Sequence, residues 1–163
     1  MRLFVPTPDE LKQIKAGALK AFIRPIEPQP IQQDELHGKP LWYWKTKKVK
    51  RGYIHRLEDS LVQWLGKCSP HQPGNVLAVI EDWWIGPWYL EVKFASYHLI
   101  VTDVQSVRTT DLTARDIEDL RSSREYTRPY AAVHVNWNTT YPDLPFEKGP
   151  WLWFYQCELE GEK

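Results

Sequence analysis

Gln72-Pro73-Gly74-Asn75-Val76-Leu77-Ala78-Val79-Ile80-Glu81 is the stretch on which the expected fold depends. Pro73 presets φ at the second position of a turn, and Gly74 or Asn75 can adopt the positive φ that the next position needs. The residues from 76 to 80 are apolar and contain no breaker, which predicts a largely buried strand. A turn that leads into a buried strand ending in Glu81 predicts the floor of a pocket.

The composition limits the classes of protein to which the chain can belong. It has 163 residues, which fits one domain with a sizeable core, and its nine Trp, eight Tyr and five Phe make it unusually aromatic. Lys plus Arg and Asp plus Glu number 21 each, so no overall charge indicates a nucleic-acid or membrane partner. Two cysteines are too few for a disulfide framework, and no leader or long apolar run is found. We therefore expect a single cytoplasmic domain, 1–163, with no membrane partner.

Helix-start and strand patterns divide most of the chain into elements. Thr7-Pro8-Asp9-Glu10 combines a cap, a first-turn proline and a capping-box Glu, so a helix is expected from there to Gly17. Other helices are expected at 58–67 and from Thr113 to about 121, and strands at 19–24, 41–44, 52–54, 76–81, 88–94, 97–107 and 151–159. Residues 25–40, rich in proline, predict an extended loop, and 129–137 fit a helix or a strand. The expected fold class is α+β, a small β-barrel or curved sheet of about five or six strands with about three capping helices.

The segment from Trp44 to Arg56 is the most basic in the chain. No acidic residue occurs in it, and the first one after it is Glu58. Its basic residues are Lys45, Lys47, Lys48, Lys50, Arg51 and Arg56. Such a run predicts a surface for phosphate, with Trp42, Trp44 or Tyr53 stacking on bases. It is also typical of a solvated hairpin tip whose lysines prevent edge pairing. The sequence leaves both interpretations open.

Cys68 and His71 lie close enough in sequence to share a metal ion. Zinc needs a second pair of ligands, and no second pair stands at ligand spacing in the sequence. We therefore expect no metal and no other cofactor, and a structural thiol at Cys68.

Four blocks of sequence occur in a fixed order along most of the chain. They are Ile14-Lys15-Ala16-Gly17 with Arg24 and Pro28-Gln29-Pro30, then Cys68 with Gln72-Pro73-Gly74-Asn75 and Glu81-x-Trp83, then Val101-Thr102-Asp103-Val104 with Arg108 and Asp111-Leu112-Thr113, and lastly Trp151-Leu152-Trp153. In combination these blocks resemble the motifs of phage and prophage ASCH-domain proteins. The resemblance implies a PUA-like fold, a small barrel with helices at its mouth, and an association with RNA, modified nucleosides or coactivator complexes.

Small relatives in that family hydrolyse N4-acetylcytidine with a Lys, a Thr and a Glu. The resemblance places these roles at Leu19, Phe22 and Leu120, and none of these side chains supplies a nucleophile, a proton or a charge. Lys20 is one residue from the first position, and in a strand it points to the opposite face. The family's Asp at the turn is Asn75 here. The resemblance therefore implies the scaffold without the hydrolase residues, and we expect no catalytic residue.

The leading hypothesis is a non-catalytic module of phage or prophage origin that binds RNA or a modified nucleoside. Its pocket is expected to contain Lys20, Arg24, Asn75, Glu81 and Trp83, and the basic segment 44–56 is its expected nucleic-acid surface. Structural interpretations compete with two of these assignments. Glu81 could pair with a nearby cation, and Trp83 could be a core residue.

Two hypotheses from other classes remain open. A hydrolase of acylated cytidine could use Glu81 as the base, with Lys20 or Arg24 at the oxyanion. Alternatively, the chain could be a phage protein that binds a host protein, such as a defence component, through the aromatic segment 83–89.

Overall fold

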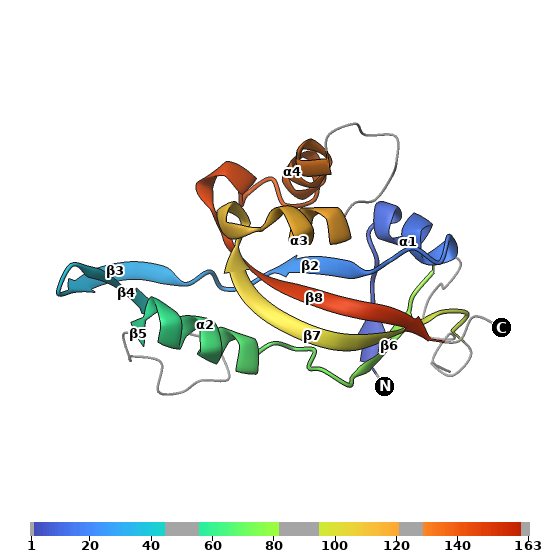
Figure 1. Cartoon of the computed structure of the whole chain (residues 1–163), viewed down its shortest axis with the longest axis horizontal. Helices are drawn as coiled ribbons and strands as arrows, with labels where there is room; N and C mark the ends of the chain where they lie inside the picture. The colour runs from blue at the N-terminus through green and yellow to red at the C-terminus, as the bar shows by residue number, and fades with distance from the viewer. Residues whose placement is uncertain (1, 45–55, 82–94, 121–128, 161–163) are drawn as a thin grey trace.

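The structure is a computed structural model that describes residues 2–44, 56–81, 95–120 and 129–160 (Figure 1). Within these residues the chain forms eight strands and four α-helices. In chain order they are β1 (Arg2–Phe4), α1 (Pro8–Lys15), β2 (Ala21–Pro25), β3 (Ile31–Leu36), β4 (Lys39–Tyr43), β5 (Arg56–Leu57), α2 (Glu58–Lys67), β6 (Val76–Val79), β7 (His98–Arg108), α3 (Ala114–Asp119), α4 (Pro129–Thr140) and β8 (Trp151–Glu160). Two short 3-10 helices, η3 (Thr109–Asp111) and η4 (Phe146–Lys148), complete the elements of these ranges. The predicted α+β class is confirmed.

Five of the strands form one sheet in the order β1-β6-β7-β8-β2. β1 and β6 run parallel, and the other neighbours are antiparallel. β7 and β8 form the longest pair, from His98 opposite Glu160 to Arg108 opposite Trp151, and their register shifts between residues 101 and 103. An extra residue in one strand bends it and increases the local twist, so this shift favours a curved sheet.

The two edge strands of this sheet, β1 and β2, approach each other through their side chains. The ring centroids of Phe4 and Phe22 are 4.6 Å apart, and Nη2 of Arg24 donates to the carbonyl of Val5 at 3.0 Å. No backbone pairing joins β1 to β2 in the described part of the chain. β1 ends just before Pro6, whose nitrogen has no hydrogen to donate to a further ladder. The sheet is therefore curved, but the closed barrel expected from the sequence is not formed.

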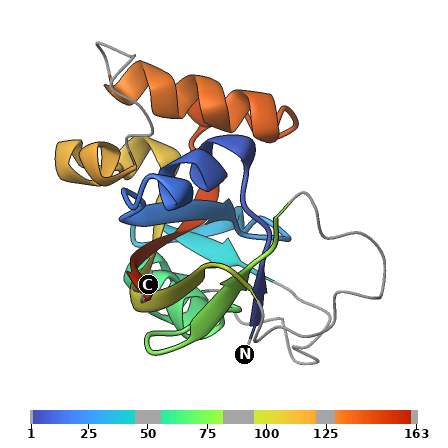
Figure 2. The ribbon, with the colours of Figure 1, turned by 90° about the vertical axis from the view of Figure 1, so that its right-hand side faces the viewer.

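Alternate side chains of β8 enter two separate cores, as the two faces of a strand require. One face contributes to the core that contains α1, α2 and β6, with Trp151, Trp153, Tyr155 and Cys157. The opposite face contributes Leu152 and Phe154 to a core with α3 and α4. Figures 1 and 2 show α3 and α4 together on one side of the sheet and α2 on the other. Most of the aromatic residues that the structure describes therefore belong to these two cores or pack against them.

Local sequence signals position the helices and the central turn as predicted. The Thr7 hydroxyl accepts from the amide of Glu10 at 3.2 Å, and the Glu10 carboxylate accepts from the amide of Thr7 at 2.9 Å. Thr113 and Asp116 form the same reciprocal capping box at the start of α3. At the turn before β6, Gly74 has φ +91°, a value at which a glycine is favoured. None of the described helices is long and apolar enough to cross a membrane.

The prediction of an extended loop at 25–40 was wrong. Residues 31–43 form the β3–β4 hairpin, which joins β5 in a three-stranded sheet and projects from the body of the molecule in Figure 1. His37 and Gly38 at its tip have φ of +52° and +78°, the pair of positive values that a type I′ turn requires. The ambiguous segment at 129–137 is helical, within α4. The strands predicted at 52–54 and 88–94 lie outside the described residues.

Candidate functional site

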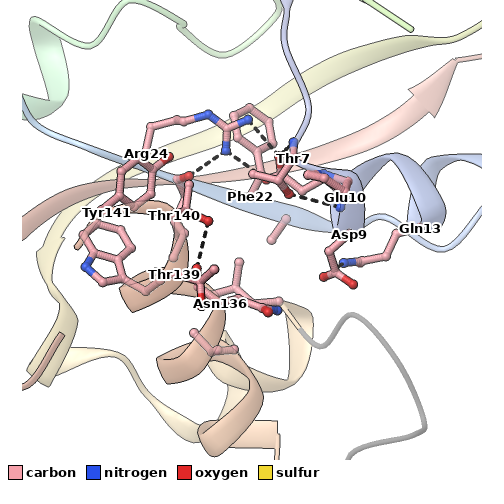
Figure 3. A pocket seen from close by; sticks show the side chains of 16 residues that line it. Thr7, Asp9, Glu10, Gln13, Phe22, Arg24, Asn136, Thr139, Thr140 and Tyr141 are labelled. Atoms are coloured by element: carbon pink, nitrogen blue, oxygen red, sulfur yellow. Dashed lines mark hydrogen bonds and ion pairs between the residues drawn. The ribbon is translucent and has the colours of Figure 1, made fainter. Parts of the chain in front are cut away.

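A cavity of about 260 Å³ lies between α1, β2 and α4 (Figure 3). Its floor is the start of β2, one wall is the first turns of α1, and the opposite wall is the second half of α4 with Tyr141. The remaining wall includes Leu120, the residue that ends α3. This volume is just below the roughly 300–1,000 Å³ of common ligand pockets, so it limits an occupant to a small molecule, about the size of a single nucleoside.

An ion pair between Arg24 and Glu10 fixes one end of this cavity. Nη1 and Nη2 of Arg24 each donate to one carboxylate oxygen of Glu10 at 2.8 Å, the bidentate geometry that is strongest for this pair. The same two nitrogens donate to the carbonyls of Ile23 at 2.7 Å and Val5 at 3.0 Å. Four of the five N–H donors of the guanidinium are thereby engaged within the protein. Arg24 therefore holds the end of β1, α1 and β2 together.

The environment of Arg24 keeps it positively charged. Burial alone would lower the pKa of Arg24, but the hydrogen bonds and negative charge of Glu10 outweigh burial and raise it. The guanidinium also lies 4.9 Å from the ring centroid of Phe4 and 5.2 Å from that of Phe22. These contacts leave Arg24 saturated, so its role is structural and a ligand gains little by pairing with it.

Gln13 is the polar side chain of the cavity that most clearly lacks a partner. It is only 5% exposed, it lines the cavity, and its Oε1 accepts no hydrogen bond from any residue that the structure describes. Its Nε2 lies 3.4 Å from Oδ2 of Asp9, a long and weak hydrogen bond. A buried amide oxygen without a donor is costly, and a ligand N–H that entered the cavity would satisfy it.

The α4 wall combines aromatic surface with hydroxyl groups. Trp137 is buried, and its indole nitrogen already donates to the carbonyl of Leu144 at 2.6 Å, so it offers apolar surface only. The hydroxyls of Thr139 and Thr140 donate to backbone carbonyls one turn earlier in the helix. Tyr141 packs against Trp137 with 4.8 Å between ring centroids, and burial is the largest of the effects that raise its pKa. Its hydroxyl therefore stays protonated and able to donate at neutral pH.

The structure brings together few of the residues predicted for the pocket. Arg24 lines the cavity, but it pairs with Glu10 and not with Glu81. Glu81 is buried, with Oε1 3.8 Å from Nζ of Lys15. The structural alternative, in which Glu81 pairs with Lys20 or Arg24, is wrong in its partner, because α1 places Lys15 beside this carboxylate instead. Lys20 is exposed and does not line the cavity.

Asn75 has a role in the turn and lies outside the cavity. Its Oδ1 accepts from the amide of Gln72 at 2.8 Å, and its own amide donates to the carbonyl of Gln72 at 3.0 Å. These two bonds close the turn that precedes β6, so the side chain is occupied in folding. Trp83 lies outside the described residues.

Most of the predicted nucleic-acid surface also lies outside the described residues. This holds for Lys45, Lys47, Lys48, Lys50, Arg51 and Tyr53, and the side chain of Arg56 is not described either. Trp44 is described, and it is only 3% exposed. Its indole nitrogen donates to the carbonyl of Pro28 at 2.6 Å, and its ring meets Trp64 edge-on at 5.0 Å. The prediction that Trp44 stacks on a base is wrong, because the ring is buried in the core.

Two of the three positions that the resemblance assigns to hydrolysis line the cavity. Phe22 and Leu120 are among its wall residues, whereas Leu19 is buried in the core. The residues that sequence reasoning missed are Glu10, Gln13 and Tyr141. The motif Thr7-x-x-Glu10 was interpreted only as a helix cap, although its carboxylate also binds Arg24.

Catalytic groups are sparse in this cavity. Of its two carboxylates, that of Glu10 is neutralised by Arg24 and that of Asp9 accepts a long hydrogen bond from Gln13. The hydroxyl of Thr7 accepts from the amide of Glu10, and those of Thr139 and Thr140 donate to backbone carbonyls. No group of His, Cys, Asp and Glu among the described residues could hold a metal ion. The arrangement is suited to holding a small planar ligand. Comparison with known proteins adds no family: no protein-family model, no curated protein and no solved structure matches this chain.

Proposed function

We propose that this chain is a PUA-like ASCH domain of phage or prophage origin that binds a nucleoside, free or within RNA, without hydrolysing it. The observation that carries the proposal is the buried Oε1 of Gln13, which accepts no hydrogen bond within the described residues, at the wall of a cavity that also presents the apolar surface of Phe22 and Trp137. Nucleobases combine flat apolar faces with N–H groups at their edges, so they match an apolar slot with one buried acceptor.

The arrangement of the sheet supports the PUA-like part of the proposal. Its edge strands meet through Phe4, Phe22 and Arg24, so the sheet is close to a barrel although it is not closed. The cavity lies where α1 and α4 flank β2, and it includes two positions that the resemblance gives to the site of its hydrolase relatives, Phe22 and Leu120. Substitution of those positions by apolar residues keeps the slot and removes the reactive groups.

Binding without turnover is supported by the state of the ionisable groups. Arg24 is saturated by hydrogen bonds within the protein, and Glu81 is 3.8 Å from Lys15 and does not line the cavity. The rearranged hydrolase site, with Glu81 as base and Arg24 at the oxyanion, therefore has no support in this geometry. An assay of N4-acetylcytidine turnover tests it directly, and product formation that Glu81→Gln abolishes would restore the enzyme hypothesis.

Affinity measurements on matched glutamine variants test the proposal. Calorimetric titrations with cytidine, N4-acetylcytidine, adenosine and uridine identify the nucleoside that binds. Gln13→Leu keeps the size of the side chain but removes the acceptor, so the affinity for that nucleoside should fall about tenfold, the value of one buried hydrogen bond. The control is Gln105→Leu, because Gln105 is exposed on β7 and does not line the cavity.

Two results would count against the proposal. Equal affinities of the Gln13→Leu and Gln105→Leu proteins would remove the cavity as the binding site. Absence of nucleoside binding, together with capture of a host protein that resists nuclease and moderate salt, would favour the host-protein hypothesis. Nucleic-acid binding through the basic segment 44–56 should instead weaken steeply as salt is raised.

A further inference from the structure

A second cavity, of about 240 Å³, lies between the β3–β4 sheet and the chain that leads into β8. Its walls include Trp42 from β4, Arg108 at the end of β7, and Lys148, Gly149 and Trp151. It shares no lining residue with the cavity beside Gln13. An inference about its ligand therefore stands apart from the proposed function.

Two buried N–H donors in this second cavity have no acceptor. The indole nitrogens of Trp42 and Trp151 lack a hydrogen-bond partner, although these side chains are only 6% and 3% exposed. Other buried indoles are satisfied, since those of Trp44, Trp137 and Trp153 donate to backbone carbonyls at 2.6, 2.6 and 2.8 Å respectively. Because a buried donor without an acceptor is costly, the two exceptions indicate an acceptor that the described part of the chain does not supply.

Arg108 places a positive charge against both of these tryptophans. Its guanidinium carbon lies 5.6 Å from the ring centroid of Trp42 and 6.0 Å from that of Trp151. Its Nε donates to the carbonyl of Gly149 at 2.8 Å, and within the described residues it forms no ion pair. In contrast to Arg24, its Nη groups are not committed to a carboxylate. Arg108 therefore has donors left for an anionic ligand.

Gly149 allows the arginine to lie this close to the backbone. A Cβ on residue 149 would be 3.1 Å from Nη2 and 3.3 Å from Nε of Arg108, and the backbone there has φ +68°. Both the contact and the conformation disfavour any other residue. Lys148 also lines the cavity and adds a second cation, whereas the exposed Asp143 subtracts one charge. The balance of these three side chains is positive.

We propose that Arg108 and the indole N–H groups of Trp42 and Trp151 form a binding site for a phosphate-class oxyanion. The two indoles and the Nη groups of Arg108 are donors without an acceptor in the described residues, and a tetrahedral oxyanion offers several acceptor oxygens around one centre. The planar guanidinium can engage two of those oxygens while the indoles serve others. The anion can be inorganic phosphate or the phosphate of a nucleotide.

Indole ¹H–¹⁵N spectra test the site, because each tryptophan gives one side-chain signal. The signals of Trp42 and Trp151 are assigned with Trp42→Phe and Trp151→Phe. Titration with sodium phosphate at constant ionic strength, against sodium chloride, should move these two signals in a saturable way and leave the signal of Trp137 in place. Arg108→Gln should weaken the phosphate affinity at least tenfold, whereas Arg115→Gln, an exposed arginine on α3, should not change it.

The outcomes are separated by further arms of the same experiment. If the intact protein shows no saturable movement of the two signals, or if Arg108→Gln binds phosphate as the intact protein does, the proposal is overturned. Arg108→Lys retains the positive charge but lacks the paired N–H donors of the guanidinium. An unchanged Trp137 signal in either Arg108 variant shows that the variant is folded. Tighter binding of a nucleoside 5′-monophosphate than of inorganic phosphate identifies a nucleotide as the source, and equal binding identifies the free anion.

Discussion

Removal of the Arg24 side chain should destabilise the protein strongly, because it leaves a carboxylate unpaired in a largely buried place. In the ion pair the side chains of Arg24 and Glu10 are only 23% and 11% exposed. Breaking one partner of a fully buried pair costs about 3–5 kcal/mol, and partial exposure reduces this, so we expect about 2–4 kcal/mol for Arg24→Met. At this chain length that corresponds to a fall in Tm of roughly 5–15 °C.

A double-mutant cycle separates the ion pair from the loss of packing. Glu10→Gln removes the charge but retains a side chain that can complete the capping box with Thr7. In the double variant the unpaired charge is absent, so its cost should be smaller than the sum of the two single costs by about 1–2 kcal/mol. The free energy of unfolding is measured by urea denaturation, followed by far-UV circular dichroism.

The other capping box provides the control for this cycle. Asp116→Asn alters the equivalent position of α3, where, among the residues that the structure describes, the Asp116 side chain accepts from the amide of Thr113 at 3.0 Å and forms no ion pair with an arginine. It should cost less than about 1 kcal/mol. If Arg24→Met costs as little as Asp116→Asn, or if the costs of the Arg24 and Glu10 substitutions simply add, the structural role assigned to the pair is wrong.

Three further predictions concern a glycine, a thiol and a histidine. Gly149→Ala should lower the free energy of unfolding, measured in urea, by at least about 1 kcal/mol more than Gly17→Ala does. Both glycines have φ +68°, but only Gly149 has side-chain atoms 3.0 to 3.3 Å from the position of an added Cβ. Equal losses would show that the neighbouring side chains move away freely. Burial raises the pKa of the Cys157 thiol to about 12. A thiol reagent at pH 8 should therefore label the exposed Cys68 quickly and Cys157 only when the protein unfolds. Rapid labelling of both cysteines would contradict the burial of Cys157. Burial also lowers the pKa of His71, so below pH 6.5 the unfolded state binds the proton more readily and stability should fall as pH decreases. His71→Gln should reduce that fall in urea denaturation between pH 7.5 and 5.5, and an unchanged pH dependence would assign it to other groups.

Features coded by neighbouring residues could be predicted from the sequence. The capping boxes at Thr7 and Thr113 and the turn at Gly74 require only residues a few positions apart, and the structure contains all three. The β3–β4 hairpin could not be predicted in the same way. Its first strand is exposed throughout, so it has no hydrophobic alternation. Its tip is His37-Gly38, which lacks the Asn-Gly or Asp-Gly signal of a two-residue hairpin turn.

The candidate site depends on contacts between distant segments, which the sequence alone does not indicate. Arg24 and Glu10 are 14 positions apart and meet only because β2 passes beside α1. In the sequence Gln13 is an ordinary helix residue, and its burial beside the cavity depends on the fold. The segment of α4, which forms the opposite wall, had no clear period in the sequence. Glu81 was the most attractive carboxylate in the sequence, but the fold places it beside Lys15 and outside the cavity.

Backbone amide ¹H–¹⁵N spectra recorded during a nucleoside titration test the central claim most directly. The claim is that the cavity between α1, β2 and α4 holds one nucleoside without converting it. We predict saturable shifts at Gln13, Phe22 and Tyr141, with the nucleoside recovered intact at the end of the titration. Shifts confined to residues outside the cavity, no shifts at all, or recovery of a hydrolysed product would contradict the claim.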